Sequence, residues 1–134
     1  MSLPSLAHAL TLLNISKMPK LYEPISFTQA SCELKRKVCN GCGSAKAKFD
    51  FVPDSIYGLH IRPACDRHDW MYYKGMTIED KAEADRVFLN NMLRIIEGAP
   101  GILSRILKPM RRRRALKYYE AVVAFGGPAF WSGK

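Results

Sequence analysis

Residues 61–97 read IRPACDRHDWMYYKGMTIEDKAEADRVFLNNMLRIIE, and this stretch decides the fold of the chain. Apolar residues recur at helical spacing as far as Gly75, which ends a first helix. Thr77, with Asp80 three residues later, has the pattern of an N-cap for a second helix over residues 77–97. Because only a short turn separates the two segments, we predict that they run antiparallel and pack against each other.

Each of these helices carries one polar residue on its apolar face. In the first helix, over residues 61–74, it is His68, and in the second it is Asp85. A buried carboxylate is costly unless a partner hydrogen-bonds it. Both residues lie at similar distances from the turn, so we predict a His68–Asp85 pair buried between the helices. The apolar residues of the two faces are Ile61, Ala64, Cys65, Met71, Tyr72, Ile78, Ala82, Phe88, Leu89, Met92 and Ile96.

A pair of this kind is either structural, satisfying two buried polar groups, or part of a reactive site. Asp69 favours the second interpretation. It follows His68 directly, projects about 100° round the helix from it, and points toward a Gly-containing loop at residues 40–53. A histidine held by one carboxylate, with another acid beside such a loop, suits a general base next to a hard cation. Calcium binds carboxylate and backbone carbonyl oxygens.

At these residues the sequence resembles the secreted phospholipases A2, nearest to their small bacterial and fungal members. Residues 65–72, CDRHDWMY, are similar to the Cys-x-x-His-Asp-x-x-Tyr signature of that family. Three further segments are similar in the same order, namely PDSIYGL at 53–59, ADRVF at 84–88 and YYEAV at 118–122. With the Gly-containing loop, the resemblance covers residues 40–126.

The resemblance implies a mainly α, phospholipase A2-like fold. Two antiparallel, disulfide-linked core helices would carry the His/Asp dyad, accompanied by a calcium loop and further helices. The chain would be one domain over residues 1–134, with an N-terminal helical region at 1–39 and a catalytic core at 40–126. A length of 134 residues with 48% hydrophobic and 25% charged residues suits one globular domain and excludes a mainly disordered chain.

The activity implied by the resemblance is calcium-dependent hydrolysis of the sn-2 ester of glycerophospholipids, which releases a fatty acid and a lysophospholipid. His68 would be the general base on water, and Asp85 would hold it. The cofactor would be calcium. Its ligands would be the Asp69 carboxylate and, mainly through backbone carbonyls, Asn40, Gly41 and Gly43.

Two features of the implied site stay open. Tyr72, four residues after His68, either supports catalysis by hydrogen-bonding Asp85 or is an ordinary core tyrosine. Asn40 stands where the bacterial and fungal relatives usually have an aspartate. A neutral ligand at this position should weaken calcium binding.

The resemblance implies a pairing for only two of the four cysteines. It implies a disulfide between Cys42 and Cys65, joining the loop to the first helix. Cys32 and Cys39 either pair with each other or remain free.

The positive charge is concentrated in one segment. The net charge is +9, yet residues 105–117 hold seven basic residues and no acid, and the remainder is close to neutral. Such a segment suits a membrane-facing patch on an anionic phospholipid surface; the alternative is a solvated helix face. No aromatic platform accompanies it, so we do not expect a nucleic-acid partner. The patch consists of Arg105, Lys108, Arg111, Arg112, Arg113, Arg114 and Lys117.

Two other functions compete with the hydrolase. One is a catalytically silent, phospholipase-like membrane-binding or toxin module, which the neutral Asn40 keeps open. The other is a zinc-binding, nucleic-acid-binding protein, because two ligand pairs have zinc-finger-like spacing. Zinc binding does not explain Asp69 or Asp85. The four zinc ligands would be Cys39, Cys42, Cys65 and His68.

We expect a secreted or extracellular monomer. No signal peptide is evident, since no basic residue precedes the apolar run at residues 3–13. The other expected elements are helices over residues 3–15, 28–38 and 101–108, a break near Pro109, a helix over 111–125, and a short strand pair around 49–52.

Overall fold

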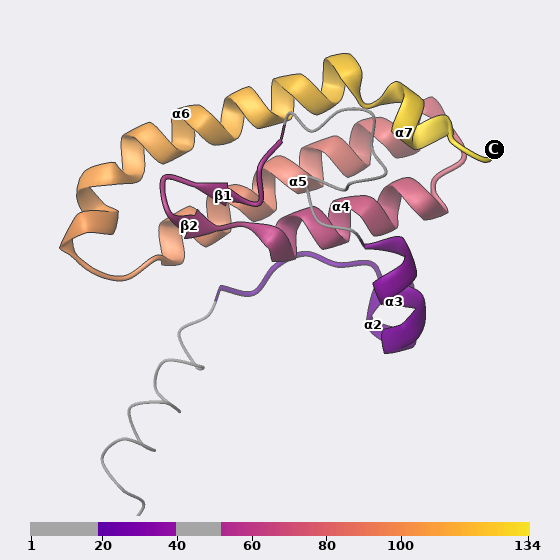
Figure 1. Ribbon diagram of the computed structural model, residues 1–134, viewed down its shortest axis with the longest axis horizontal. Helices are drawn as coiled ribbons and strands as arrows, with labels where there is room; N and C mark the ends of the chain where they lie inside the picture. Colours follow the sequence, from indigo (N-terminus) through magenta and orange to yellow (C-terminus); the bar gives the residue numbers. More distant parts are fainter. Residues whose placement is uncertain (1–18, 40–51) are drawn as a thin grey trace, which may run out of the picture.

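The computed structural model describes residues 19–39 and 52–134; the helix expected over residues 3–15 lies outside them. In the described part, α5 is the central helix, since it packs against both α4 and α6 (Figure 1). The expected mainly α class is therefore confirmed. The three long helices are α4 (Arg62–Lys74), α5 (Ile78–Gly98) and α6 (Ile102–Phe125).

The two helices expected from residues 61–97 form, and residues 75–77 join them. Thr77 Oγ1 accepts a hydrogen bond from the Asp80 N–H at 3.0 Å, and the Asp80 carboxylate accepts one from the Thr77 N–H at 3.1 Å. This capping box begins α5 as expected. The expectation that the two helices are linked by a disulfide is wrong, because α5 contains no cysteine.

α6 differs from the prediction, because it continues through Pro109 instead of breaking there. A proline inside a helix leaves the carbonyl four residues earlier without its partner, at a cost of about 3 kcal/mol. Pro109 and Arg105, which carries that carbonyl, are both exposed, so water can bond it. Packing along the rest of the helix offsets the cost.

A short C-terminal helix, α7 (Gly127–Trp131), was not predicted. It contacts α4 and α6, and Figure 1 shows it beside the turn between α4 and α5. Phe130 of α7 is fully buried. A Cβ atom at Gly75 would lie 2.7 Å from the Phe130 ring, so a glycine in this turn is what allows α7 to pack there.

The N-terminal part is divided where a single helix was expected over residues 28–38. It forms α2 (Ile25–Gln29) and α3 (Cys32–Val38). Phe27 meets Trp70 of α4 edge to face, with ring centroids 5.9 Å apart. This aromatic contact anchors the N-terminal part on the first long helix.

A hairpin precedes α4. The strand pair expected around residues 49–52 falls mostly outside the described residues, and the strands lie further along the chain, as β1 (Ser55–Ile56) and β2 (Leu59–His60). They pair antiparallel, with Ile56 opposite Leu59.

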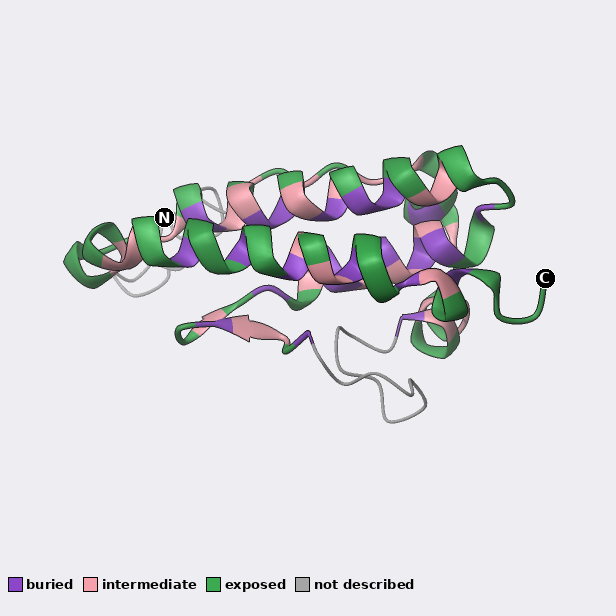
Figure 2. Ribbon diagram, turned by 90° about the horizontal axis from the view of Figure 1, so that it is seen from above, coloured by how far each residue is buried: buried purple, intermediate pink, exposed green. Residues whose placement is uncertain are grey.

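The core lies between the three long helices and the hairpin, and Figure 2 shows the buried residues on the faces that the helices turn toward one another. Most apolar residues expected on these faces are buried. Ile78 and Ala82 are exposed, whereas Ala84 and Asp85 in the same turns are buried, so the buried face of α5 passes through Ala84 rather than Ala82. The main cluster contains Val52, Ile56, Ile61, Ala64, Cys65, Phe88, Met92, Ile96, Ala115, Tyr118 and Val122.

A buried amide fastens the N-terminal segment to α5. The Asn91 side chain accepts a hydrogen bond from the Tyr22 N–H at 2.9 Å and donates one to the Tyr22 carbonyl at 3.0 Å. Asn91 is completely buried, so both of its polar atoms depend on these backbone partners.

We expect Asn91→Ala to lower the free energy of unfolding by about 2 kcal/mol, because it removes both hydrogen bonds between this fully buried side chain and the Tyr22 backbone. Urea unfolding followed by circular dichroism measures this change. Asn90→Ala is the matched control, since Asn90 is the neighbouring residue and is exposed; its effect should stay within about 0.5 kcal/mol. Equal effects at the two positions would contradict the role of the buried amide.

Candidate active site

The pair expected between α4 and α5 is present. His68 Nε2 lies 2.8 Å from Asp85 Oδ1. His68 is 7% exposed and Asp85 1% exposed, so the contact is buried between the two helices. Helical periodicity and a short turn thus place an imidazole and a carboxylate together inside the protein.

Two further side chains complete the surroundings of Asp85. The Tyr72 hydroxyl donates to Asp85 Oδ1 at 2.6 Å, which settles the open question about its partner. Lys81 Nζ donates to Oδ2 at 2.8 Å and to the Val122 carbonyl of α6 at 3.0 Å. Lys81 was missed in the sequence, although its spacing of four residues from Asp85 on one helix was the available signal. Both oxygens of the carboxylate are therefore held in place.

The protonation states follow from this arrangement. Burial alone would raise the pKa of Asp85, but hydrogen bonds from His68, Lys81 and Tyr72 outweigh it and hold the pKa below its usual value. Burial lowers the pKa of His68, and the hydrogen bond and charge of Asp85 oppose this only in part. At neutral pH the pair is thus a carboxylate beside a neutral imidazole. An ionised carboxylate only accepts, so Nε2–H is the donor and Nδ1 is the nitrogen that can take a proton.

Aromatic rings enclose the imidazole. The Phe88 ring stacks on His68 with centroids 4.6 Å apart, and the Tyr72 ring lies 4.1 Å away. Phe130 of α7 supports Tyr72 edge to face, with ring centroids at 5.2 Å. A Cβ atom at Gly126 would collide with the Tyr72 hydroxyl, so glycine at the end of α6 leaves room for that hydroxyl. The imidazole is consequently fixed in one orientation.

Asp69, the predicted calcium ligand, is half-buried on α4 directly after His68. The other predicted ligands, Asn40, Gly41 and Gly43, lie outside the described residues. Burial raises the pKa of the Cys39 thiol to about 12, with further contributions from the charges of Asp66 and Asp69. Cys39, which immediately precedes Asn40, contacts α4 at the Asp66 carbonyl. A carboxylate combined with backbone carbonyls is a donor set that suits calcium.

The described cysteines settle one open alternative. Cys32 and Cys39 are free thiols, and Cys39 Sγ donates to the Asp66 carbonyl at 3.2 Å. Cys42 lies outside the described residues, so its disulfide with Cys65 stays a prediction. Among the described residues, no group of three acidic, histidine or cysteine side chains is arranged to hold a metal ion.

The two free thiols should differ in reactivity. Cys32 is exposed and Cys39 is buried, and only the thiolate form reacts. We expect iodoacetamide at pH 8 to modify Cys32 roughly a hundredfold faster than Cys39, because burial disfavours the Cys39 thiolate. Peptide mass spectrometry measures both rates. In urea the rates should converge, whereas equal rates in the folded protein would contradict the burial of Cys39.

The basic patch expected over residues 105–117 is only partly as predicted. Arg111 does not face outward: it is 5% exposed, and its guanidinium donates to the Tyr57 carbonyl at 2.8 Å. It tethers the hairpin to α6. Arg112 and Lys108 pair with Glu97. In the two described stretches, no helix is long and apolar enough to cross a membrane.

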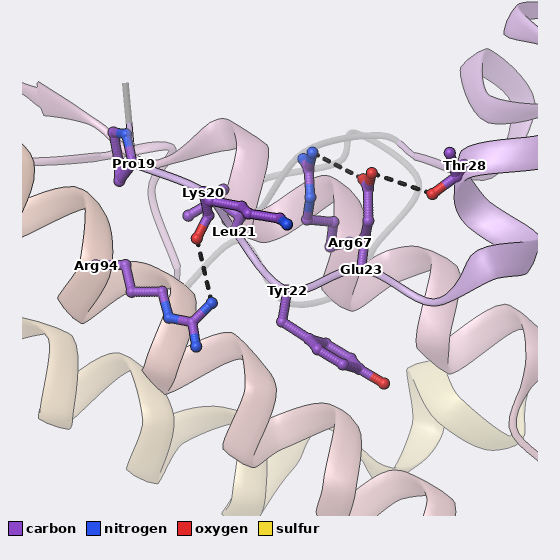
Figure 3. A pocket seen from close by; sticks show the side chains of 8 residues that line it. All are labelled: Pro19, Lys20, Leu21, Tyr22, Glu23, Thr28, Arg67 and Arg94. Carbon is purple, nitrogen blue, oxygen red and sulfur yellow. Dashed lines mark hydrogen bonds and ion pairs between the residues drawn. The ribbon is translucent and has the colours of Figure 1, made fainter. Parts of the chain in front are cut away.

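A pocket lies where the N-terminal segment crosses α4 and α5 (Figure 3). Its volume is about 610 Å³. Arg67 pairs with Glu23 at 2.9 Å, and Arg94 donates to the Lys20 carbonyl at 3.2 Å. Its lining includes neither residue of the dyad, and two of its cations are already engaged within the protein.

Comparisons with protein-family models, with curated proteins and with solved structures found no match to this chain. The resemblance to phospholipases A2 rests on the motifs quoted above.

Proposed function

We propose that this protein is a calcium-dependent phospholipase A2, which hydrolyses the sn-2 ester of glycerophospholipids to a fatty acid and a lysophospholipid. The observation that carries the proposal is the buried contact of 2.8 Å between His68 Nε2 and Asp85 Oδ1, with Asp69 directly after the histidine. A neutral imidazole oriented by a carboxylate is suited to general-base catalysis.

In the proposed reaction, His68 Nδ1 takes a proton from a water molecule as that water attacks the ester carbonyl. The imidazolium that forms is stabilised by Asp85, which also fixes the tautomer. The carbonyl carbon then loses the lysophospholipid oxygen, and the proton on His68 passes to that oxygen. No serine or cysteine nucleophile takes part.

Asp69, Asn40, Gly41 and Gly43 would hold the calcium. When bound, it would pair with the substrate phosphate and polarise the ester carbonyl. Tyr72 and Lys81 act on Asp85 rather than on substrate, since both donate to its carboxylate.

The proposal is tested by fatty-acid release from vesicles of mixed anionic and zwitterionic phospholipid, with calcium and then with excess chelator. Label at the sn-2 position should be released only with calcium, and label at sn-1 should remain on the lipid. Absence of release under both conditions would favour the silent membrane-binding module. Release that is insensitive to chelator would contradict the calcium requirement.

A further inference from the structure

The side of α6 that points away from the protein is unusually apolar. A helix packed on a protein normally has charged and polar residues on its outward side. The buried side of α6 contains Arg111, Ala115, Tyr118 and Val122. On the opposite side, Ile102, Ile106 and Met110 follow one another at four-residue spacing, with exposures of 78%, 66% and 49%.

We call this side the outer face of α6 and define it as Ile102, Arg105, Ile106, Met110, Arg113 and Leu116, all of which are exposed. Helical geometry at about 100° per residue places all six on the side opposite Arg111 and Ala115. Figure 1 shows α6 along one edge of the molecule, with α5 on its inner side. The outer face therefore has no neighbour among the described elements.

The charge on this face is positive. The sequence has no acidic residue between Glu97 and Glu120. Most basic residues nearby already have partners. Arg114 donates to the Tyr57 hydroxyl at 2.9 Å, and Lys108 and Arg112 pair with Glu97. In the described part of the chain, Arg105 and Arg113 have no ion-pair partner. They are the charges left available on the apolar face.

We propose that the outer face of α6 docks on the surface of an anionic phospholipid membrane. The isoleucines and Met110 would enter the boundary between headgroups and acyl chains, while Arg105 and Arg113 would meet lipid phosphates. The inference rests on the proposed function, because it names the surface through which the enzyme reaches its lipid substrate.

The composition of the face disfavours two other binding partners, namely a second copy of the chain and a nucleic acid. Two copies joined through it would bring the like charges of Arg105 and Arg113 together, and Glu120, the only acidic residue of α6, already pairs with Lys117. A nucleic acid would match the arginines but not the four exposed apolar side chains of the face. A membrane with anionic headgroups matches both, since it offers negative charge above an apolar interior.

The test is sedimentation with vesicles in excess chelator, so that binding is measured without turnover. The vesicles contain phosphatidylcholine alone or phosphatidylcholine with phosphatidylglycerol. We expect the wild-type chain to bind the anionic vesicles. Ile106→Asp should weaken this binding at least about tenfold, because it replaces a buried apolar contact with a charge. Arg113→Glu should weaken it about thirtyfold, since it changes two charges near the surface.

Each variant has a matched control on another part of the molecule. Ile78→Asp makes the same change at an isoleucine that is 72% exposed on α5, and Arg36→Glu makes the same charge change at an exposed residue of α3. Both controls should bind as the wild type does, or within about threefold. Circular dichroism checks that all four variants fold.

Three outcomes would overturn the proposal. The wild type could fail to sediment with anionic vesicles, the controls could lose as much binding as the test variants, or gel filtration could show a dimer that Ile106→Asp separates. Failure of the proposed function is measured independently, as absence of hydrolysis of a dispersed short-chain phospholipid. If that hydrolysis occurs, Ile106→Asp should leave it unchanged.

Discussion

His68→Asn lowers the turnover of sn-2 hydrolysis by about a thousandfold, if the imidazole is the general base. The substitution removes Nδ1 as a proton acceptor at neutral pH, because the asparagine amide has no basic nitrogen. Asp85 still accepts hydrogen bonds from Tyr72 and Lys81, so the buried carboxylate retains partners. Initial rates at saturating calcium and lipid measure the effect.

His60→Asn is the control for this experiment. His60 lies on β2 and is exposed, so the same chemical change there should leave turnover within about twofold. Circular dichroism and urea unfolding of both variants separate loss of chemistry from loss of structure. If His68→Asn kept a tenth or more of the wild-type turnover while folded, the general-base role of His68 would be wrong.

The central part of the site could be predicted because its determinants are local. Two polar residues on apolar helical faces, with a three-residue connection between the helices, leave little freedom in how the faces meet. His68 and Asp85 are therefore placed by periodicity alone. The cap at Thr77 is equally local, since its partner Asp80 is three residues away.

The features that could not be predicted depend on distant parts of the chain. Arg111 is one of four consecutive arginines, and it differs from its neighbours in being buried, with its guanidinium on the backbone carbonyl of Tyr57, far away in sequence. Phe130 packs on Tyr72 through a helix of five residues, which is too short for a periodic signal. A proline normally ends a helix, but the packing of α6 on α5 overrides that preference at Pro109.

Lys81 shows why local spacing alone was insufficient. A lysine four residues from an aspartate is common on solvated helix surfaces, where such a pair adds only about 0.3–0.5 kcal/mol. Here Asp85 is buried, and Lys81 also donates to the carbonyl of Val122 on α6. Its importance thus comes from the third helix, whose position the sequence of α5 does not specify.

The second large effect is expected from Asp85→Asn, which should lower turnover by roughly a hundredfold or more and the free energy of unfolding by about 3 kcal/mol. The two losses have different causes. Turnover falls because the His68 imidazolium loses the stabilising negative charge of Asp85, and because the imidazole ring is no longer held in one tautomer. Stability falls because the amide leaves the ammonium of Lys81, which is largely buried, without its anionic partner.

Lys81→Met separates these causes. In the double variant Asp85→Asn/Lys81→Met, no unpaired ammonium remains, so urea unfolding should recover about half of the lost stability. Turnover should not recover, because the charge that supports His68 is still absent. Lys81→Arg keeps the positive charge and should retain more activity and stability than Lys81→Met. If the double variant regained turnover together with stability, Asp85 would act on the fold rather than on the imidazole, and its assignment as the partner of the general base would fail.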